Sequence, residues 1–197
     1  FERGFCVMKV CQELGELEQM QETVQRMGDS GLLGRLPQEV EEGYLGTCAK
    51  GKVAWLDPDD PVYTGDELLE LCNRRLSHLA ALLQPFSEDA LGKVIDERTP
   101  ALVSLSLLEE DEDDYPFPLA DDKTLGDFLG TWRRALLRAV YYMGPEIASV
   151  TLERQDGPAA AALPCQQETI SVAASANTLL LFRTDCFNLE RVAEGEV

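Results

Sequence analysis

The sequence predicts an α+β domain in which helices come first and a succession of strands follows. In the first half, apolar residues recur at steps of three and four, as they do along one face of a helix. From about residue 98, short β-rich runs separated by turn residues replace that pattern. This order is typical of an α+β domain whose β part is a sandwich or a barrel.

The first half begins with a β-prone run over 4–10, followed by a helix that the turn residues of 28–34 stop. A short strand within 50–61 ends in a turn rich in Pro and Asp. A second helix begins near Thr64, which has capping-box spacing with Glu67, and Pro85 ends it. The apolar faces of the two helices are Leu14, Leu17, Met20, Val24 and Met27, and Leu68, Cys72, Leu76, Leu79 and Leu83.

The second half contains β-rich runs over 99–107, 136–144 and 148–157, and one or two more strands over 168–184. The Ala/Pro stretch over 156–164 is interpreted as a loop between strands. We expect a single domain, 1–197, with a strand and helices in 1–97 and a β-rich barrel part in 98–197.

Charge is the strongest signal in the composition. The chain has 17 basic and 36 acidic residues, a formal net charge of −19 and a pI of about 4.3. Such a surface repels nucleic-acid backbones and anionic lipids, and no apolar stretch is long enough for membrane insertion. The expected partners are other protein subunits with basic surfaces.

The six cysteines show no metal-binding or disulfide pattern. They are Cys6, Cys11, Cys48, Cys72, Cys165 and Cys186, with no CxxC pair among them. Scattered cysteines among apolar residues favour a reducing intracellular compartment, the cytoplasm or an organelle matrix or stroma, although the sequence does not fix the location.

Several short matches occur in one shared order. Gly4, Phe5 and Val7 fit a "GF-x-V" opening before a long helix, and Trp55 lies on the following strand. An Arg-Thr turn at 98–99 introduces the next strand, and an aromatic pair ends the strand over 137–144. In this order the chain resembles the prolyl 4-hydroxylase-like branch of the iron(II)/2-oxoglutarate dioxygenases. The resemblance implies a double-stranded β-helix, which is a jelly-roll or cupin-like fold, with N-terminal helices packed on the sheet.

The resemblance also implies an iron site, and the ligands for it are missing. The family holds Fe(II) with His-x-Asp/Glu on one strand and a second His much later. The first motif falls on Pro118, Leu119 and Ala120, and the second His on 188–190, while the chain's single histidine is His78. The degenerate metal-site positions are therefore Pro118, Ala120, Asp121 and Glu190. We expect neither iron nor 2-oxoglutarate, and the strand with the family's cosubstrate-binding basic residue is expected to be missing.

Two groups of residues remain open to interpretation. Asp121, Asp122 and Glu190 could hold Mg²⁺ or Ca²⁺ through oxygen atoms alone, or be isolated surface carboxylates. Phe128 and Trp132, on a short helix predicted from Thr124 and Asp127, could plug the barrel or belong to an ordinary core.

The acidic run is either a docking loop for a basic partner or a solvated loop. It consists of Glu109, Glu110, Asp111, Glu112, Asp113 and Asp114.

No other catalytic pattern is present, because a Ser or Cys nucleophile would have only His78 as its base. We expect no catalytic residues and a structural, accessory or scaffolding role within a larger protein or complex. The alternatives are an active dioxygenase with an atypical metal site, and a module that binds a small anion or a peptide in the old cleft.

Overall fold

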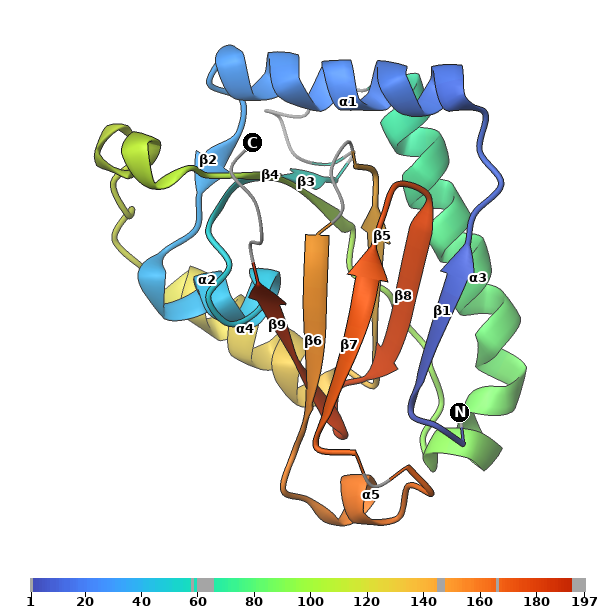
Figure 1. Ribbon diagram of the computed structural model, residues 1–197. Helices are drawn as coiled ribbons and strands as arrows, with labels where there is room; N and C mark the ends of the chain where they lie inside the picture. Colours follow the sequence, from blue (N-terminus) through green and yellow to red (C-terminus); the bar gives the residue numbers. More distant parts are fainter. Residues whose placement is uncertain (1, 58, 60–65, 145–147, 166, 193–197) are drawn as a thin grey trace.

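The computed structural model describes residues 2–57, 59, 66–144, 148–165 and 167–192. Within these residues helices and strands are mixed along the chain, as Figure 1 shows. The described strands form three sheets of three strands each, which we name sheets A, B and C. The mixed helix and strand content agrees with the predicted α+β class.

Sheets A and C face each other across a shared apolar core, with sheet C in front of β5 and β8 in Figure 1. Sheet A has the order β1 (Phe5–Lys9), β8 (Thr178–Arg183) and β5 (Leu137–Tyr142). Sheet C has the order β7 (Thr169–Ala174), β6 (Ala148–Arg154) and β9 (Phe187–Val192). All of these pairs are antiparallel. The core between the sheets includes Val150, Leu152, Val172, Leu180, Phe182 and Leu189.

Sheet B lies between two layers of helices. It consists of β2 (Gly34–Arg35), β3 (Gly51–Leu56) and β4 (Ala101–Ser106). Successive side chains of a strand point to opposite faces. Leu56 therefore packs with α1 (Leu14–Asp29) and α3 (Glu67–Leu91), whereas Val53 packs with α2 (Gln38–Leu45) and α4 (Asp122–Arg134).

The predicted opening strand and first helix are confirmed as β1 and α1. Leu17, Met20 and Val24 of the predicted apolar face are buried, while Leu14 in the first turn is exposed. β1 pairs with β8, and β3 pairs with β4, so 1–97 and 98–197 contribute strands to common sheets. The two predicted parts of the chain are thus joined through sheets A and B.

The prediction that Pro85 ends the second helix is wrong, because α3 continues to Leu91. A proline inside a helix removes one backbone hydrogen bond and need not end the helix if later groups are held. Here the Ser87 hydroxyl donates to the Gln84 carbonyl at 2.7 Å and accepts from the Ile95 N–H at 3.0 Å. The helix stops at Gly92, whose φ of 71° is left-handed.

The N-caps predicted for α3 and α4 are also corrected. α3 is capped by Asp66, whose Oδ1 accepts from the N–H groups of Leu68 and Leu69 at 3.0 Å each, and Thr64 lies outside the described residues. α4 is capped by Asp121 and begins at Asp122, so Thr124 is already helical. In both cases an aspartate immediately before the helix occupies the N-cap position.

Several short elements were not predicted, β2 and β9 among them. α2 has eight residues, too few for a helical period to be recognised over a window of 11 or more residues. The stretch over 156–164, interpreted as a loop, contains the one-turn helix α5 (Pro158–Ala161). The acidic run forms the 3₁₀ helix η1 (Glu109–Asp114) and is not an irregular loop. The run over 168–184 forms two strands, β7 and β8.

None of the helices in the described part of the chain combines the length and apolar character needed to cross a bilayer.

Candidate functional site: a cavity beside Arg138

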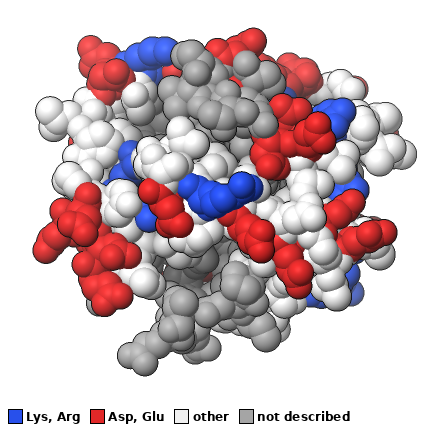
Figure 2. Space-filling model, turned by 90° about the horizontal axis from the view of Figure 1, so that it is seen from above, with Lys and Arg blue, Asp and Glu red and all other residues white. Residues whose placement is uncertain are grey.

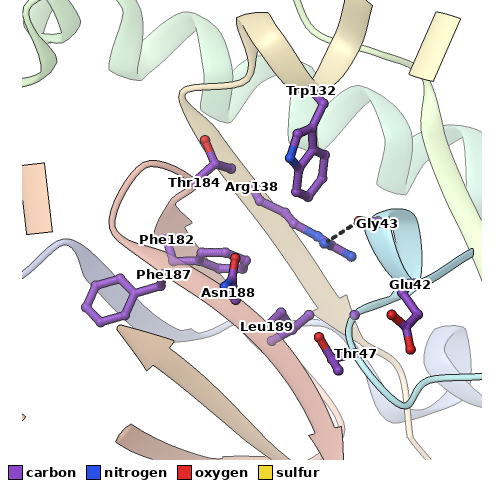
Figure 3. A pocket seen from close by; sticks show the side chains of 11 residues that line it. Glu42, Gly43, Thr47, Trp132, Arg138, Phe182, Thr184, Phe187, Asn188 and Leu189 are labelled. Atoms are coloured by element: carbon purple, nitrogen blue, oxygen red, sulfur yellow. Dashed lines mark hydrogen bonds between the residues drawn. The ribbon is translucent and has the colours of Figure 1, made fainter. Parts of the chain in front are cut away.

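A cavity of about 210 Å³ lies where β5, β8 and β9 meet the C-terminal ends of α2 and α4 (Figure 3). Its lining comes from five elements and the segments that connect them. The lining residues are Glu42, Gly43, Gly46, Thr47, Trp132, Arg138, Phe182, Thr184, Phe187, Asn188 and Leu189.

β9 reaches the cavity because the turn after β8 reverses the chain. In that turn the Arg183 guanidinium donates to the Asp185 carboxylate at 2.8 and 3.0 Å. β9 then pairs with β6, and the Leu189 carbonyl accepts from the Thr47 N–H at 2.9 Å. Gly46 is required at this crossing, because a Cβ atom there would lie 2.9 Å from the Leu189 carbonyl oxygen and φ is 109°.

Arg138 is the charged group at the centre of the lining (Figure 3). Its Nη1 donates to the Gly43 carbonyl at 3.0 Å, and its Nη2 donates to the Tyr44 carbonyl. These carbonyls belong to the last turn of α2, which has no helical partners for them. Burial lowers the pKa of Arg138 to about 10, so the guanidinium remains protonated at neutral pH. No carboxylate of the described residues forms an ion pair with it.

Aromatic side chains form much of the remaining wall. Phe182 and Phe187 are buried, and Trp132 is 42% exposed at the edge. Trp132 stacks on Phe128 with ring centroids 5.6 Å apart, and Phe128 contacts Tyr44 at 5.2 Å. This aromatic row holds α4 against α2, and its end, Trp132, forms part of the cavity wall.

The polar lining residues are anchored by neighbouring loops. The Thr184 hydroxyl donates to the Ala135 carbonyl at 2.8 Å, and Asn188 Oδ1 accepts from Gln155 Nε2 at 2.8 Å. Both bonds fix side chains at the edge of the cavity. The lining therefore combines one half-buried cation, fixed polar groups and an apolar wall.

The four degenerate metal-site positions lie on two segments. Pro118 and Asp121 are exposed between η1 and α4, Ala120 is half-buried beside them, and Glu190 is half-buried on β9. Asp121 is the cap of α4 and accepts from the Thr124 N–H at 2.6 Å. That hydrogen bond lowers the pKa of Asp121. Its carboxylate is thus already used in a helix cap.

The described residues do not fit the iron site of the related oxygenases. Among them, no group of three or more His, Cys, Asp and Glu side chains lies close enough to hold a metal ion. His78 is exposed on α3, away from β9. At the position expected for the second histidine, β9 instead presents Asn188 and Leu189 to the cavity. Two imidazole ligands cannot come from a chain with one histidine.

The two proposed plug residues have different surroundings. Trp132 lines the cavity, whereas Phe128 packs in the core between α2, α4 and sheet B. The acidic residues lie apart from the cavity on η1, where Lys50 forms an ion pair with Glu112. Whether Trp132 blocks a former channel stays a prediction, as does docking by the acidic segment.

Cys186 lies in the turn before β9, and its thiol is buried. Burial, together with the hydrogen bond to Asp185, raises the pKa of Cys186 to about 11. Nucleophilic thiols need the opposite shift, because the thiolate is the reactive form. We therefore assign Cys186 to the core.

Sequence reasoning did not select Arg138, Thr47 or Glu42. A signal for Arg138 exists in the run LLRAVYY, where one cation interrupts an otherwise apolar strand. Charged residues are mostly exposed, so an arginine within such an apolar run indicates a position with a specific polar partner. No comparable signal marks Thr47 or Glu42, which reach the cavity through the fold.

Comparison with solved structures shows the fold. A prolyl-4-hydroxylase from Pseudomonas putida superposes with a TM-score of 0.60 at 15% identity, covering 98% of this chain and 88% of that one. A prolyl hydroxylase from Trichoplax adhaerens, solved with a peptide fragment of the hypoxia-inducible factor oxygen degradation domain, gives 0.58 at 12% identity, with 96% and 77% covered. By sequence, no family model and no curated protein matches the chain.

The chain therefore has a prolyl-4-hydroxylase-like 2-oxoglutarate oxygenase fold, as the sequence predicts. Identities of 15% and 12% establish the fold and leave activity to be argued from the residues.

Proposed function

We propose that this chain is a non-catalytic prolyl-4-hydroxylase-like domain that serves as an accessory or scaffolding subunit of a larger protein or complex. The observation that carries the proposal is the composition of the two expected ligand positions. Pro118 and Ala120 have no ligand atom in their side chains, and β9 presents Asn188 and Leu189. Accordingly, we propose neither resident iron nor bound 2-oxoglutarate.

We further propose that sheets A and C are the two sheets of a degenerate double-stranded β-helix. Their antiparallel strands and shared core support this interpretation. In the related oxygenases, a strand with the first ligands follows the equivalent of β4. Here that part of the chain, 113–122, contains the end of η1 and the start of α4. A helix with Trp132 at the cavity replaces a strand with metal ligands.

The proposed partners are protein subunits with basic surfaces. A net charge of −19 and acidic side chains at many places on the face seen in Figure 2 support this choice. Leu82 and Phe86 on α3 are 70% and 63% exposed, which offers apolar contact area as well. Nucleic acid is a poor partner for the same charge.

A second candidate function, the binding of a small anion in the cleft, is favoured by Arg138. A half-buried guanidinium that forms no ion pair with a described carboxylate offers charged hydrogen-bond donors to an anion. The two candidates are compatible, because a scaffold domain can retain a ligand site.

Metal and cosubstrate binding test the non-catalytic assignment. The purified chain, freed of metal by chelation, is titrated with Mn²⁺ with and without 2-oxoglutarate, and thermal stability and calorimetric heat are recorded. We expect that Mn²⁺ and 2-oxoglutarate together raise Tm no more than either ligand does alone, because a ligand stabilises the chain only by binding to the folded state. An active prolyl hydroxylase treated in the same way is the positive control.

Stabilisation by Mn²⁺ that depends on 2-oxoglutarate would overturn the assignment. It would instead favour an active dioxygenase with an atypical metal site, and substitution of Asp121 and Glu190 by alanine would then locate its ligands.

A further inference from the structure

The charge of Arg138 is only partly compensated by the protein. Its two hydrogen bonds end on carbonyls at the C-terminus of α2, where the helix dipole is equivalent to roughly half a negative charge. α2 has only eight residues, and no described carboxylate pairs with the guanidinium. Arg138 is half-buried and lines the cavity, so it presents there a positive charge that no described carboxylate pairs with.

The guanidinium also keeps hydrogen-bonding capacity. Arginine has five N–H donors in a planar fork, and Arg138 uses two of them on Gly43 and Tyr44. Figure 3 shows the group among the lining residues, with Trp132 on one side and Thr47 on the other. A carboxylate matches the spacing of the remaining donors, because an arginine fork binds two carboxylate oxygens at once.

The rest of the cavity disfavours a second negative charge. Arg138 is the cation of the lining, and Glu42 stands at the exposed edge close to Thr47. A dicarboxylate would place its second carboxylate against aromatic rings or near Glu42, where like charges repel. The lining is thus suited to a ligand with one anionic end.

The shape and composition of the wall indicate the body of the ligand. Phe182, Trp132 and Leu189 provide apolar surface, and aromatic rings stack well on other flat rings. The volume, about 210 Å³, is below the roughly 300–1,000 Å³ of pockets that hold drug-sized ligands. The ligand is therefore small, with a flat apolar body.

We propose that the cavity binds a small aromatic monocarboxylate, with its carboxylate on Arg138 and its ring against Trp132 and Phe182. This inference rests on the second candidate function, anion binding in the cleft. It is independent of the accessory role, and of whether metal and 2-oxoglutarate bind.

Three probes of similar size test the proposal by calorimetry on the full chain: phenylacetate, its neutral amide phenylacetamide, and the dicarboxylate succinate. We expect saturable binding of phenylacetate, with the amide weaker by about tenfold or more, because a charge-assisted hydrogen bond contributes roughly 1.5–3 kcal/mol. Succinate should also bind at least about tenfold more weakly. Tryptophan fluorescence should change on binding in the wild type and not in the W132F variant, which retains Trp55.

Glu42→Gln provides a variant that preserves the fold, since Glu42 is exposed. Removing its charge should strengthen succinate binding more than phenylacetate binding, by about threefold or more under the Coulomb repulsion expected near a surface. Glu39→Gln is the matched control, because Glu39 is exposed on the same helix and does not line the cavity. It should leave all three affinities unchanged.

Arg138→Gln should abolish phenylacetate binding. If this substitution unfolds the chain by releasing α2, the Glu42→Gln variant and the three probes still test the proposal. Equal affinity for phenylacetate and phenylacetamide would overturn the proposal. So would the absence of saturable binding at phenylacetate concentrations up to about 10 mM. Binding of succinate as tight as that of phenylacetate would overturn the monocarboxylate assignment. A 2-oxoglutarate response that needs Mn²⁺ concerns the non-catalytic assignment alone.

Discussion

Arg35 and Glu41 form a buried ion pair that fixes the segment after η1. Arg35 Nε lies 3.1 Å from Glu41 Oε1, and the side chains are only 4% and 6% exposed. Arg35 also donates to the Tyr115 carbonyl at 3.0 Å, and its guanidinium lies 3.6 Å from the centre of the Phe117 ring. One arginine thus joins β2, α2 and the segment between η1 and α4.

Replacing Glu41 by leucine should lower the free energy of unfolding by about 3–5 kcal/mol, because Arg35 would remain buried without its partner. The R35M/E41L double variant should recover part of that loss, since no charge is then left unpaired. Urea unfolding followed by circular dichroism measures both values, with Glu39→Gln as an exposed control on the same helix. A loss below about 1 kcal/mol in the single variant would contradict this role for the pair.

Residues of this kind are hard to select from sequence. Glu41 and Arg35 lie in a stretch with many charged and glycine residues, where the ordinary expectation is solvent exposure. They are buried because sheet B and α2 enclose them together with Tyr115 and Phe117. The role of Arg138, likewise, is evident only from the structure, in which carbonyls of the last turn of α2 accept its hydrogen bonds.

At the scale of elements, α4 shows how one residue sets a boundary. Asp121 accepts from the Thr124 N–H, so its carboxylate serves as the N-cap of α4. The hydrogen bond lowers the pKa of Asp121. A lowered pKa in the folded state means that the contribution to stability is present above the pKa of the unfolded chain and is lost as pH falls through the folded value.

Asp121→Asn should keep the cap and remove this pH dependence, because asparagine caps helices as well as aspartate but has no charge to interact with the helix dipole. We expect the wild type to be more stable than the variant at pH 7 and the difference to shrink below about pH 4. Thermal unfolding from pH 7 to pH 2.5 measures it. Asp122→Asn, in the first turn of α4, is the control, and a difference that persists at the lowest pH would refute the explanation.

Long elements were predicted better than short ones. β4, β5 and β6 and the helices α1 and α3 follow from periodicity, because their apolar residues repeat over enough positions to define a face. α2 and α5 give no such pattern. The prediction placed the end of α3 at Pro85, because the sequence does not show the hydrogen bond from the Ile95 N–H to the Ser87 hydroxyl that stabilises the turn beyond Pro85.

At the scale of the whole molecule, the net charge of −19 is the dominant property. Like charges on one surface repel each other and destabilise the compact state. The ion pairs of the described residues include Arg35 with Glu41 and Lys50 with Glu112, and they involve few of the 36 acidic residues. The folded chain therefore retains much of its internal repulsion.

Salt should stabilise the chain through screening. Between about 10 mM and 1 M NaCl the Debye length falls from roughly 30 to 3 Å. We expect Tm to rise by a few degrees at pH 7.5, since about 1 kcal/mol shifts Tm by roughly 2–4 °C in a chain of this size. Near the pI of about 4.3 the same titration should give a smaller rise. Equal rises at both pH values would point to a general salt effect in place of charge repulsion.

The sequence by itself determined the fold class, the order of the major elements and the resemblance to prolyl 4-hydroxylases, because these depend on periodicity and on local residue preferences. It also determined that these 197 residues cannot supply two histidine ligands to iron, because they contain only one histidine. The tertiary structure alone decided that Arg138, Thr47 and Glu42 share a cavity with Trp132. Glu42 and Thr47 are far from Trp132 and Arg138 in the sequence, and only the tertiary packing brings the four side chains to one cavity.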